Sequence, residues 1–172
     1  MAEIPSLLNH YKVYKDGENL VGVSGEVELP ELSAITDALE GTGVLGEIED
    51  PATGQFESAT VKIPFANLYV SVYDICNVND VPQLTLRGSE QVQDSTTGKT
   101  IYEPVRVVIR GKAKTITNGS MQKGKKMEAE VELEILYIKI EVNNEELLEL
   151  DKLNFVYKVR GVDLLADIRS QC

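Results

Sequence analysis

Two stretches of alternating residues, VRVVIRGKAK at 105–114 and MEAEVELEI at 127–135, decide the fold of this 172-residue chain. Both alternate apolar with charged side chains, which is the two-residue period of a β-strand with one buried face. The polar face of the first stretch is largely basic, and that of the second carries four glutamates. Because opposite charges on neighbouring strands attract, we predict one long antiparallel β-hairpin over residues 102–142.

The expected register of this hairpin follows from its loop, which we predict at Asn118–Lys126. In that register Lys114 faces Glu130 and Lys112 faces Glu132. A slip of one residue would set charged side chains against apolar ones along the whole ladder. Each cross-strand ion pair contributes only roughly 0.2–1 kcal/mol. The pairs therefore specify the register more than they stabilise the sheet.

The alternation changes phase after Ile135, where Leu136, Ile138 and Ile140 become the apolar set. Such a change is typical of a β-bulge, or of a strand that passes from one sheet to another. An arm of about sixteen residues would also reach on the order of 50 Å. Most strands have roughly five or six residues. We therefore expect the pairing of these strands to continue onto a neighbouring subunit.

Length and cysteine content fit one domain over residues 1–172. Cys76 and Cys172 have no Cys-x-x-Cys spacing, and His10 is the single histidine, so neither a zinc site nor a disulfide framework is predicted. The sequence shows no secretory leader and no apolar run long enough to span a membrane. We expect a chain that folds in the cytosol without stable membrane insertion.

The net charge of −11 is unevenly distributed along the chain. Residues 1–99 carry 16 acids and 5 bases, whereas residues 100–172 carry 12 of each. This distribution argues against a basic nucleic-acid-binding surface. The acid excess of residues 1–99 then forms either an acidic face that repels polyanions or a charged surface that keeps the protein soluble.

Turn signals and periodicity predict the remaining elements. Asp16-Gly17 is typical of a type I′ turn and predicts a hairpin over residues 11–29. Glu31–Pro51 is a long excursion with a possible short helix through Leu39, and such segments are usually functional or ordered by a partner. For Asn67–Cys76 the periodicity predicts a helix, and its β-branched and tyrosine content leaves a strand as the alternative. Further strands are expected at residues 58–64, 82–92 and 145–157, a turn at Asn143-Asn144, and a short helix at Val162–Arg169.

Two glycine-containing motifs bear on ligand binding. GTGVLG at 41–46 matches the dinucleotide pattern G-x-G-x-x-G, but an acidic stretch follows where a helix N-terminus is required. GSMQKGKK at 119–126 resembles a phosphate loop, yet Lys126 stands where a Mg²⁺-binding Ser or Thr belongs. One histidine also assembles no Ser/His/Asp or Cys/His set. We therefore predict no catalytic residue, no cofactor-binding residue and no metal ligand, and a protein that is not an enzyme.

Seven short segments, distributed over nearly the whole chain, follow one another in an order that is typical of one protein family. They are LPEL (29–32), GTGVLG (41–46), LRG (86–88), VIRGK (108–112), YIKIEV (137–142), LELD (148–151) and RGVDLL (160–165). In this order the chain resembles the major tail tube protein of contractile-tailed phages and of related phage-tail-like (R-type) bacteriocins. The last segment is the most specific.

The resemblance implies a mainly β fold, an antiparallel β-sandwich or barrel with a flanking α-helix and a long inter-subunit loop at Glu31–Pro51. Six subunits would join their strands into one ring barrel, which removes the exposed strand edges of a monomer. Stacked rings would form the inner tube of a contractile tail or injection particle, a conduit for DNA or a membrane-penetrating channel.

The same resemblance implies the partners and the location. The partners are further copies of the chain, the contractile sheath protein, baseplate and tail-terminator proteins, and a tape-measure protein inside the tube. In a phage, DNA would pass through the lumen without specific binding. The location is the tail of a virion or bacteriocin particle, assembled in the host bacterial cytoplasm.

A second class of function stays open at this point. A monomeric antiparallel β-barrel with a roomy apolar interior could bind a small ligand. Such a protein would keep its monomer mass of 19.0 kDa in solution. Native mass therefore separates the two classes.

Overall fold

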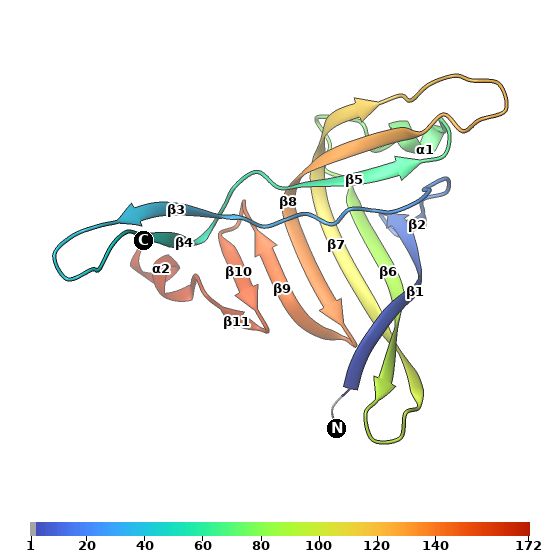
Figure 1. Cartoon of the computed structure of the whole chain (residues 1–172). Coiled ribbons are helices and arrows are strands. Elements are labelled where there is room, and N and C mark those ends of the chain that lie inside the picture. The colour runs from blue at the N-terminus through green and yellow to red at the C-terminus, as the bar shows by residue number, and fades with distance from the viewer. Residues whose placement is uncertain (1–2) are drawn as a thin grey trace.

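Antiparallel strands make up most of the protein, whose computed structural model describes residues 3–172 (Figure 1). The elements in chain order are β1 (Glu3–Lys15), β2 (Glu18–Asn19), β3 (Ala34–Leu39), β4 (Ile48–Phe56), β5 (Thr60–Phe65), α1 (Val70–Tyr73), β6 (Gln83–Asp94), β7 (Thr100–Thr117), β8 (Ala129–Val142), β9 (Glu145–Asp151), β10 (Val156–Val159), β11 (Val162–Asp163) and α2 (Ala166–Gln171). The predicted fold class, mainly β with a flanking short helix, is confirmed.

One large sheet has the strand order β11-β10-β9-β8-β7-β6-β1-β2, and β5 joins it by pairing with β8. Strand β8 changes partner along its length. Residues 129–134 pair with β5, and residues 137–142 pair with β9. The sheet does not close on itself, because β2 and β11 lie at its opposite ends (Figure 1).

The predicted hairpin is formed by β7 and β8, but its predicted register is wrong. Lys112 faces Glu134 rather than Glu132, a shift of two residues. The Lys114 ammonium lies 3.4 Å from the Glu134 carboxylate and not beside Glu130. The shift is two residues only at Gly111–Ala113; from Val105 to Arg110 and from Thr115 to Thr117 it is three residues.

Two bulges explain the register. The change of phase after Ile135 is confirmed as a bulge, since Arg110 pairs with Tyr137 and Gly111 pairs with Ile135, which leaves Leu136 without a partner on β7. A second irregularity on the other strand leaves Lys114 outside the pairing, between Ala113 and Thr115. The two insertions lie on opposite strands, so outside them the pairing returns to one common register.

The core lies between one face of the sheet, the β5 segment and α1. Its largest fully buried side chains come from the centre of the sheet, the β5 strand and the α1 region: Phe65, Ile63, Ile75, Leu84, Ile109, Leu133, Ile135, Ile138 and Leu150. Helix α1 is shorter than the helix predicted at Asn67–Cys76, but Val72 and Ile75 are buried as its apolar face required.

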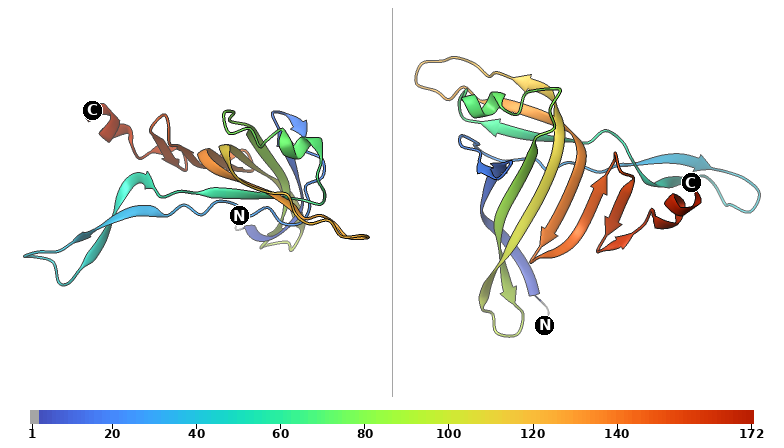
Figure 2. Two further views of the ribbon diagram at one scale, coloured as in Figure 1. Left: turned by 90° about the horizontal axis from the view of Figure 1, so that it is seen from above. Right: turned by 180° about the vertical axis from the view of Figure 1, so that it is seen from behind.

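The excursion at Glu31–Pro51 contains no helix in the structure, so the short helix predicted through Leu39 is wrong. Residues 34–39 form β3, which pairs with β4 in a hairpin that projects from the sheet (Figures 1 and 2). An isolated helix of six residues is not stable in water, whereas pairing with β4 gives the backbone of residues 34–39 hydrogen-bond partners. The tip of this hairpin carries Gly41, Gly43 and Gly46 with positive φ.

Two other predictions are confirmed in part. The turn at Asp16-Gly17 has φ of 47° and 92° and closes a hairpin, but its second strand is only β2, and residues 20–29 run irregularly. The terminal helix begins at Ala166, not at Val162, because Val162–Asp163 form β11. The Asn143-Asn144 turn and the strands predicted at 58–64 and 82–92 are confirmed, and the region predicted as strand at 145–157 contains two strands, β9 and the beginning of β10.

Candidate self-assembly surface

The large sheet ends in two edges whose backbone groups lack partners in the described chain. Strand β1 pairs with β6 along its inner side. On its outer side Tyr14 and Lys15 pair with β2, and the Val13 carbonyl accepts from the Leu20 N–H at 2.8 Å, so we call the outer side of Glu3–Lys12 the β1 edge. At the other end, β10 pairs with β11 through Lys158 and Val159, and the Leu164 N–H donates to the Tyr157 carbonyl. The outer side of the two-residue strand β11 therefore ends the sheet, and we call this end the β10–β11 edge.

Part of the β1 edge is regular enough to pair with another strand. Register shifts interrupt β1 between Pro5 and Leu7 and between Leu8 and His10. From His10 onward the pairing with β6 is continuous. An exposed regular edge is a template for pairing with another chain.

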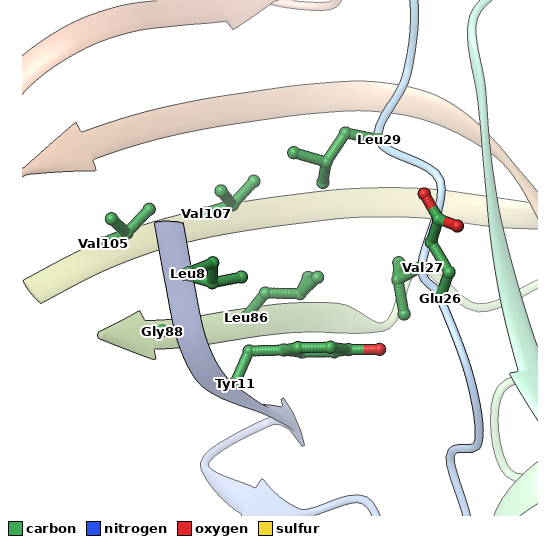
Figure 3. Close-up of a pocket in the computed structure, with 9 residues that line it drawn as sticks. All are labelled: Leu8, Tyr11, Glu26, Val27, Leu29, Leu86, Gly88, Val105 and Val107. Carbon is green, nitrogen blue, oxygen red and sulfur yellow. The ribbon is translucent and has the colours of Figure 1, made fainter. Parts of the chain in front are cut away.

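An apolar hollow lies beside the β1 edge (Figure 3). Its volume is about 240 Å³, below the roughly 300–1,000 Å³ of small-molecule pockets. It is lined mainly by apolar side chains: Leu8, Tyr11, Val27, Leu29, Leu86, Val105 and Val107. Leu8 is 52% exposed although it lies against this hollow. Exposed apolar area next to an unpaired strand edge is typical of an interaction surface.

The opposite face of the sheet carries a network of ion pairs. The Lys139 ammonium lies 2.9 Å from Glu141 and 3.2 Å from Glu146. In the same network Lys158 contacts Glu149 at 3.1 Å. Hydrogen bonds to Glu141 and Glu146 raise the pKa of Lys139. The bases of this region therefore meet carboxylates of the same chain.

Tyr137 lies within this network and is held neutral. Its hydroxyl donates to a Glu149 oxygen at 3.0 Å, and the Arg110 guanidinium lies 4.0 Å from its ring centre. Burial, followed by the bond to Glu149, raises the pKa of Tyr137 to about 12. Arg110 also contacts Asp151 at 3.7 Å. A positive charge over an aromatic ring is favourable, so Arg110 is fixed by two contacts.

Three bases lie in one row across β1, β6 and β7. Lys12 is directly opposite Arg87, and Arg87 is directly opposite Arg106. Arg106 contacts Glu141 at 3.5 Å, whereas Lys12 and Arg87 form no ion pair with another described residue. Like charges directly opposite one another are destabilising. An anionic neighbour at the β1 edge would relieve that repulsion.

The glycine motifs that resembled nucleotide-binding sequences both connect strands. The 41–46 motif forms the tip of the β3–β4 hairpin, where a strand follows instead of the helix that pyrophosphate binding requires. A Cβ at Gly41, Gly43 or Gly46 would meet no other atom within 4 Å, so these glycines shape a turn rather than a tight cradle. The 119–126 motif lies in the loop between β7 and β8.

The two cysteines and the histidine lie apart from one another. The Cys76 thiol is half-buried and donates to the Val72 carbonyl oxygen at 3.1 Å, and burial raises its pKa. Cys172 and His10 are exposed. Within residues 3–172, no three His, Cys, Asp or Glu side chains are grouped as a metal ion would need. No helix in the same range is long and apolar enough to cross a membrane.

The β1 edge was not foreseen from the sequence, and the reason lies in its pattern. EIPSLLNHYKVYK alternates regularly only near its end, at Tyr11–Lys15, because the two register shifts disturb the earlier part. The signal that could have revealed the edge is Pro5, since proline within a strand is found mainly at edges and bulges.

Known proteins resemble this chain in sequence and in fold. The sequence model of the family described as Phage tail tube protein FII matches residues 5–172. The tail tube protein of Escherichia phage P2 is 30% identical over 172 residues, with 96% of each chain covered. The major tail tube protein of Serratia phage KSP20 is 26% identical over 167 residues, which cover 95% of this chain and 93% of that protein.

A solved structure shares the fold. It is the sheath/tube terminator of an extracellular contractile injection system, PVC, in its extended state. The TM-score is 0.55 at 13% identity, with 82% of this chain and 99% of that chain covered. An open sheet with two unpaired edges, a family match over almost the full length and two tail tube relatives all agree. The chain belongs to the phage tail tube protein FII family.

Proposed function

We propose that this protein forms the inner tube of a contractile tail or injection particle by closing into hexameric rings that stack. The observation that carries the proposal is the open sheet, which has the β1 edge at one end and the β10–β11 edge at the other. If the β1 edge of one copy pairs with the β10–β11 edge of the next, the backbone N–H and C=O groups of both edges gain partners, and the closed ring has no exposed edge. The structural role in a tail tube is that of the family to which the chain belongs.

The difference between the two edges supports a head-to-tail arrangement. Contacts between unlike surfaces produce a ring when the rotation closes, whereas a two-fold dimer pairs a surface with itself. The basic row at Lys12 and Arg87 lies at one end of the sheet. Near the other end, the acids of β9 are paired within the chain: Glu145 with Arg160, Glu146 with Lys139 and Glu149 with Lys158. A contact between the two ends would therefore join unlike surfaces.

The whole of residues 1–172 acts in this proposal as a single tail-tube domain. Its partners are further copies of itself, the sheath protein, baseplate and tail-terminator proteins, and a tape-measure protein in the lumen. DNA crosses the lumen without specific binding if the particle is a phage. The protein acts in the particle tail after assembly in the host bacterial cytoplasm, without catalysis, cofactor, metal ion or stable membrane insertion.

The monomeric ligand-binding barrel is not supported as an alternative. The matched family and both relatives are tail tube proteins. The sheet is also open, and the apolar hollow of about 240 Å³ is smaller than typical small-molecule pockets.

Electron microscopy and light scattering of the purified protein test the proposal. We expect rings or tubes without ATP or added metal. Leu8→Lys with Leu29→Lys should abolish them, because both side chains are about half exposed beside the β1 edge and can change without disturbing the core. Val78→Lys is the control, since Val78 is equally exposed but lies in the loop after α1. A stable 19.0 kDa monomer with protected amides along the β1 edge would refute the proposal.

A further inference from the structure

The excess negative charge of the protein is confined to one part of the chain. Residues 16–61 contain eleven acids and no base, and the rest of the chain contains 17 of each. The β3–β4 hairpin lies within that stretch. Its acids are all exposed, and none forms an ion pair with another described residue: Asp37, Glu40, Glu47, Glu49 and Asp50. This projecting hairpin is therefore an uncompensated acidic surface.

A second projecting segment has the opposite charge. The β7–β8 loop, residues 118–128, contains Lys123, Lys125 and Lys126, all exposed. These lysines contact no carboxylate of the described chain within 4 Å. Between residues 119 and 127 the loop contains no acid. It is the end of a longer acid-free stretch, residues 104–127, which holds seven bases in a chain whose net charge is −11.

Both segments also present apolar side chains to solvent. Leu45 at the tip of the hairpin is fully exposed, and Leu39 and Ile48 beside it are half exposed. Met121 in the β7–β8 loop is 90% exposed. Covering such side chains is favourable by roughly 25 cal/mol per Å² of apolar area removed from water. Each tip therefore combines charge with an apolar side chain that has no contact partner.

The two segments project from opposite ends of the molecule. The hairpin extends on the side of the β10–β11 edge, and the β7–β8 loop extends on the side of the β1 edge (Figures 1 and 2). They cannot meet within one chain. A head-to-tail neighbour that joins the two sheet edges would also bring the hairpin of one copy to the loop side of the next.

We propose that the acidic β3–β4 hairpin of one copy docks on the basic β7–β8 loop of a second copy, with Leu45 and Met121 at the contact. This inference rests on the proposed self-assembly and names the surfaces that orient it. Opposite charges steer the encounter, and steering of this kind raises association rates by roughly 10- to 1,000-fold. Each exposed ion pair adds at most about 1 kcal/mol, so the apolar side chains supply much of the contact.

Disulfide cross-linking tests the contact directly. Leu45→Cys and Met121→Cys are made as separate variants in a Cys172→Ser background, and one of them carries a mass tag. After mixing, assembly and mild oxidation, we expect the disulfide-linked heterodimer of the two variants in at least roughly tenfold excess over either homodimer. The reason is that the hairpin tip of one copy contacts the β7–β8 loop of the next copy and not another hairpin tip. Each variant alone, and the Cys172→Ser parent, are the controls. A heterodimer no more abundant than the homodimers would overturn the inference.

Charge exchange tests the electrostatic part. Reversal of Lys123, Lys125 and Lys126 to Glu should slow assembly by roughly tenfold or more at low salt. The difference should shrink as ionic strength rises, because the Debye length falls to about 3 Å at 1 M salt. A partner with Glu47→Lys and Glu49→Lys should restore the rate. Equal rates for wild type and the reversed loop would overturn the inference while rings still form, whereas a wild type that never assembles would overturn the proposed function itself.

Discussion

Gly111 lies where β7 passes the bulge of β8, and adding one carbon atom there should destabilise the subunit. A Cβ at this position would lie 2.5 Å from the backbone oxygen of Glu134 and 3.4 Å from Leu133 Cβ. Ordinary van der Waals contact begins at 3.4 Å, so the strands would have to separate by the difference, 0.9 Å. The obstacle is backbone at the centre of the longest strand pair, which has few ways to move.

The expected magnitude follows from two opposing effects. Overpacking in a well-packed region costs about 1–3 kcal/mol. Replacing glycine in a strand interior recovers about 0.5–1 kcal/mol of conformational entropy. We expect Gly111→Ala to lower the free energy of unfolding by about 1–2 kcal/mol. For a chain of this length, each kcal/mol corresponds to a fall in Tm of about 2–4 °C.

Gly88→Ala in neighbouring β6 is the matched control. Its added Cβ would meet Leu8 Cδ1 at 2.8 Å, the free end of a side chain that is half exposed and can rotate away. Neither Gly88 nor Gly111 has a positive φ, so backbone strain does not separate them. We expect Gly88→Ala to change stability by less than about 0.5 kcal/mol.

Urea unfolding, followed by circular dichroism at a fixed low protein concentration, measures both changes. Light scattering of the same samples confirms that all three proteins are monomeric, since assembly would shift apparent stability with concentration. Gly111→Ala should lose clearly more stability than Gly88→Ala. If the two variants unfold at the same urea concentration with equal slopes, the close approach of β7 to the β8 bulge is not real.

Three further outcomes follow from the structure. Leu165→Ala should increase hydrogen exchange in the β3–β4 hairpin, because buried Leu165 packs against β4 at Gly54; unchanged exchange would show that the hairpin is held elsewhere. A double-mutant cycle between Lys114 and Glu134 should give a coupling energy below about 1 kcal/mol, as for other partly exposed ion pairs. A larger coupling energy would contradict the partial exposure of this pair. Tyr137 has a pKa of about 12 when folded and 10 in its ordinary state, so the stability it contributes is complete below pH 10 and is lost as the pH rises through 12. Tyr137→Phe should therefore lose less stability than wild type between pH 10 and 12, and identical losses in denaturation at the two pH values would count against the neutral Tyr137.

Local features of the sequence were sufficient for the long hairpin and several turns. The alternation in β7 and β8 requires only that each strand bury one face, and this rule operates within a few residues. The turns at Asp16-Gly17 and Asn143-Asn144 depend on residues that tolerate positive φ, and all four have it. The phase change after Ile135 likewise revealed the β8 bulge, because a bulge reverses the face of every later side chain.

Local context also indicated that no helix follows the glycines at 41–46, where the structure has β4 (Ile48–Phe56). A pyrophosphate site needs a helix after the glycines, and the acidic residues after Gly46 argued against one. The apolar hollow beside β1 could not be foreseen, since its lining comes from strands and a loop distant in the sequence, including Leu8, Leu29 and Val105.

The sequence by itself determined that the chain is mainly β, that its longest strands form one hairpin, and where the charge excess lies. Only the tertiary structure decided the register, the β3–β4 strands and the two unpaired edges. The register depends on the bulge at Lys114, and Ile116 is the single apolar residue of β7 after that bulge, which is too few to show a change of phase. Strand edges depend on which segments meet, and the backbone groups that pair or stay unpaired are the same in every residue except proline, so apart from Pro5 no side-chain pattern records them.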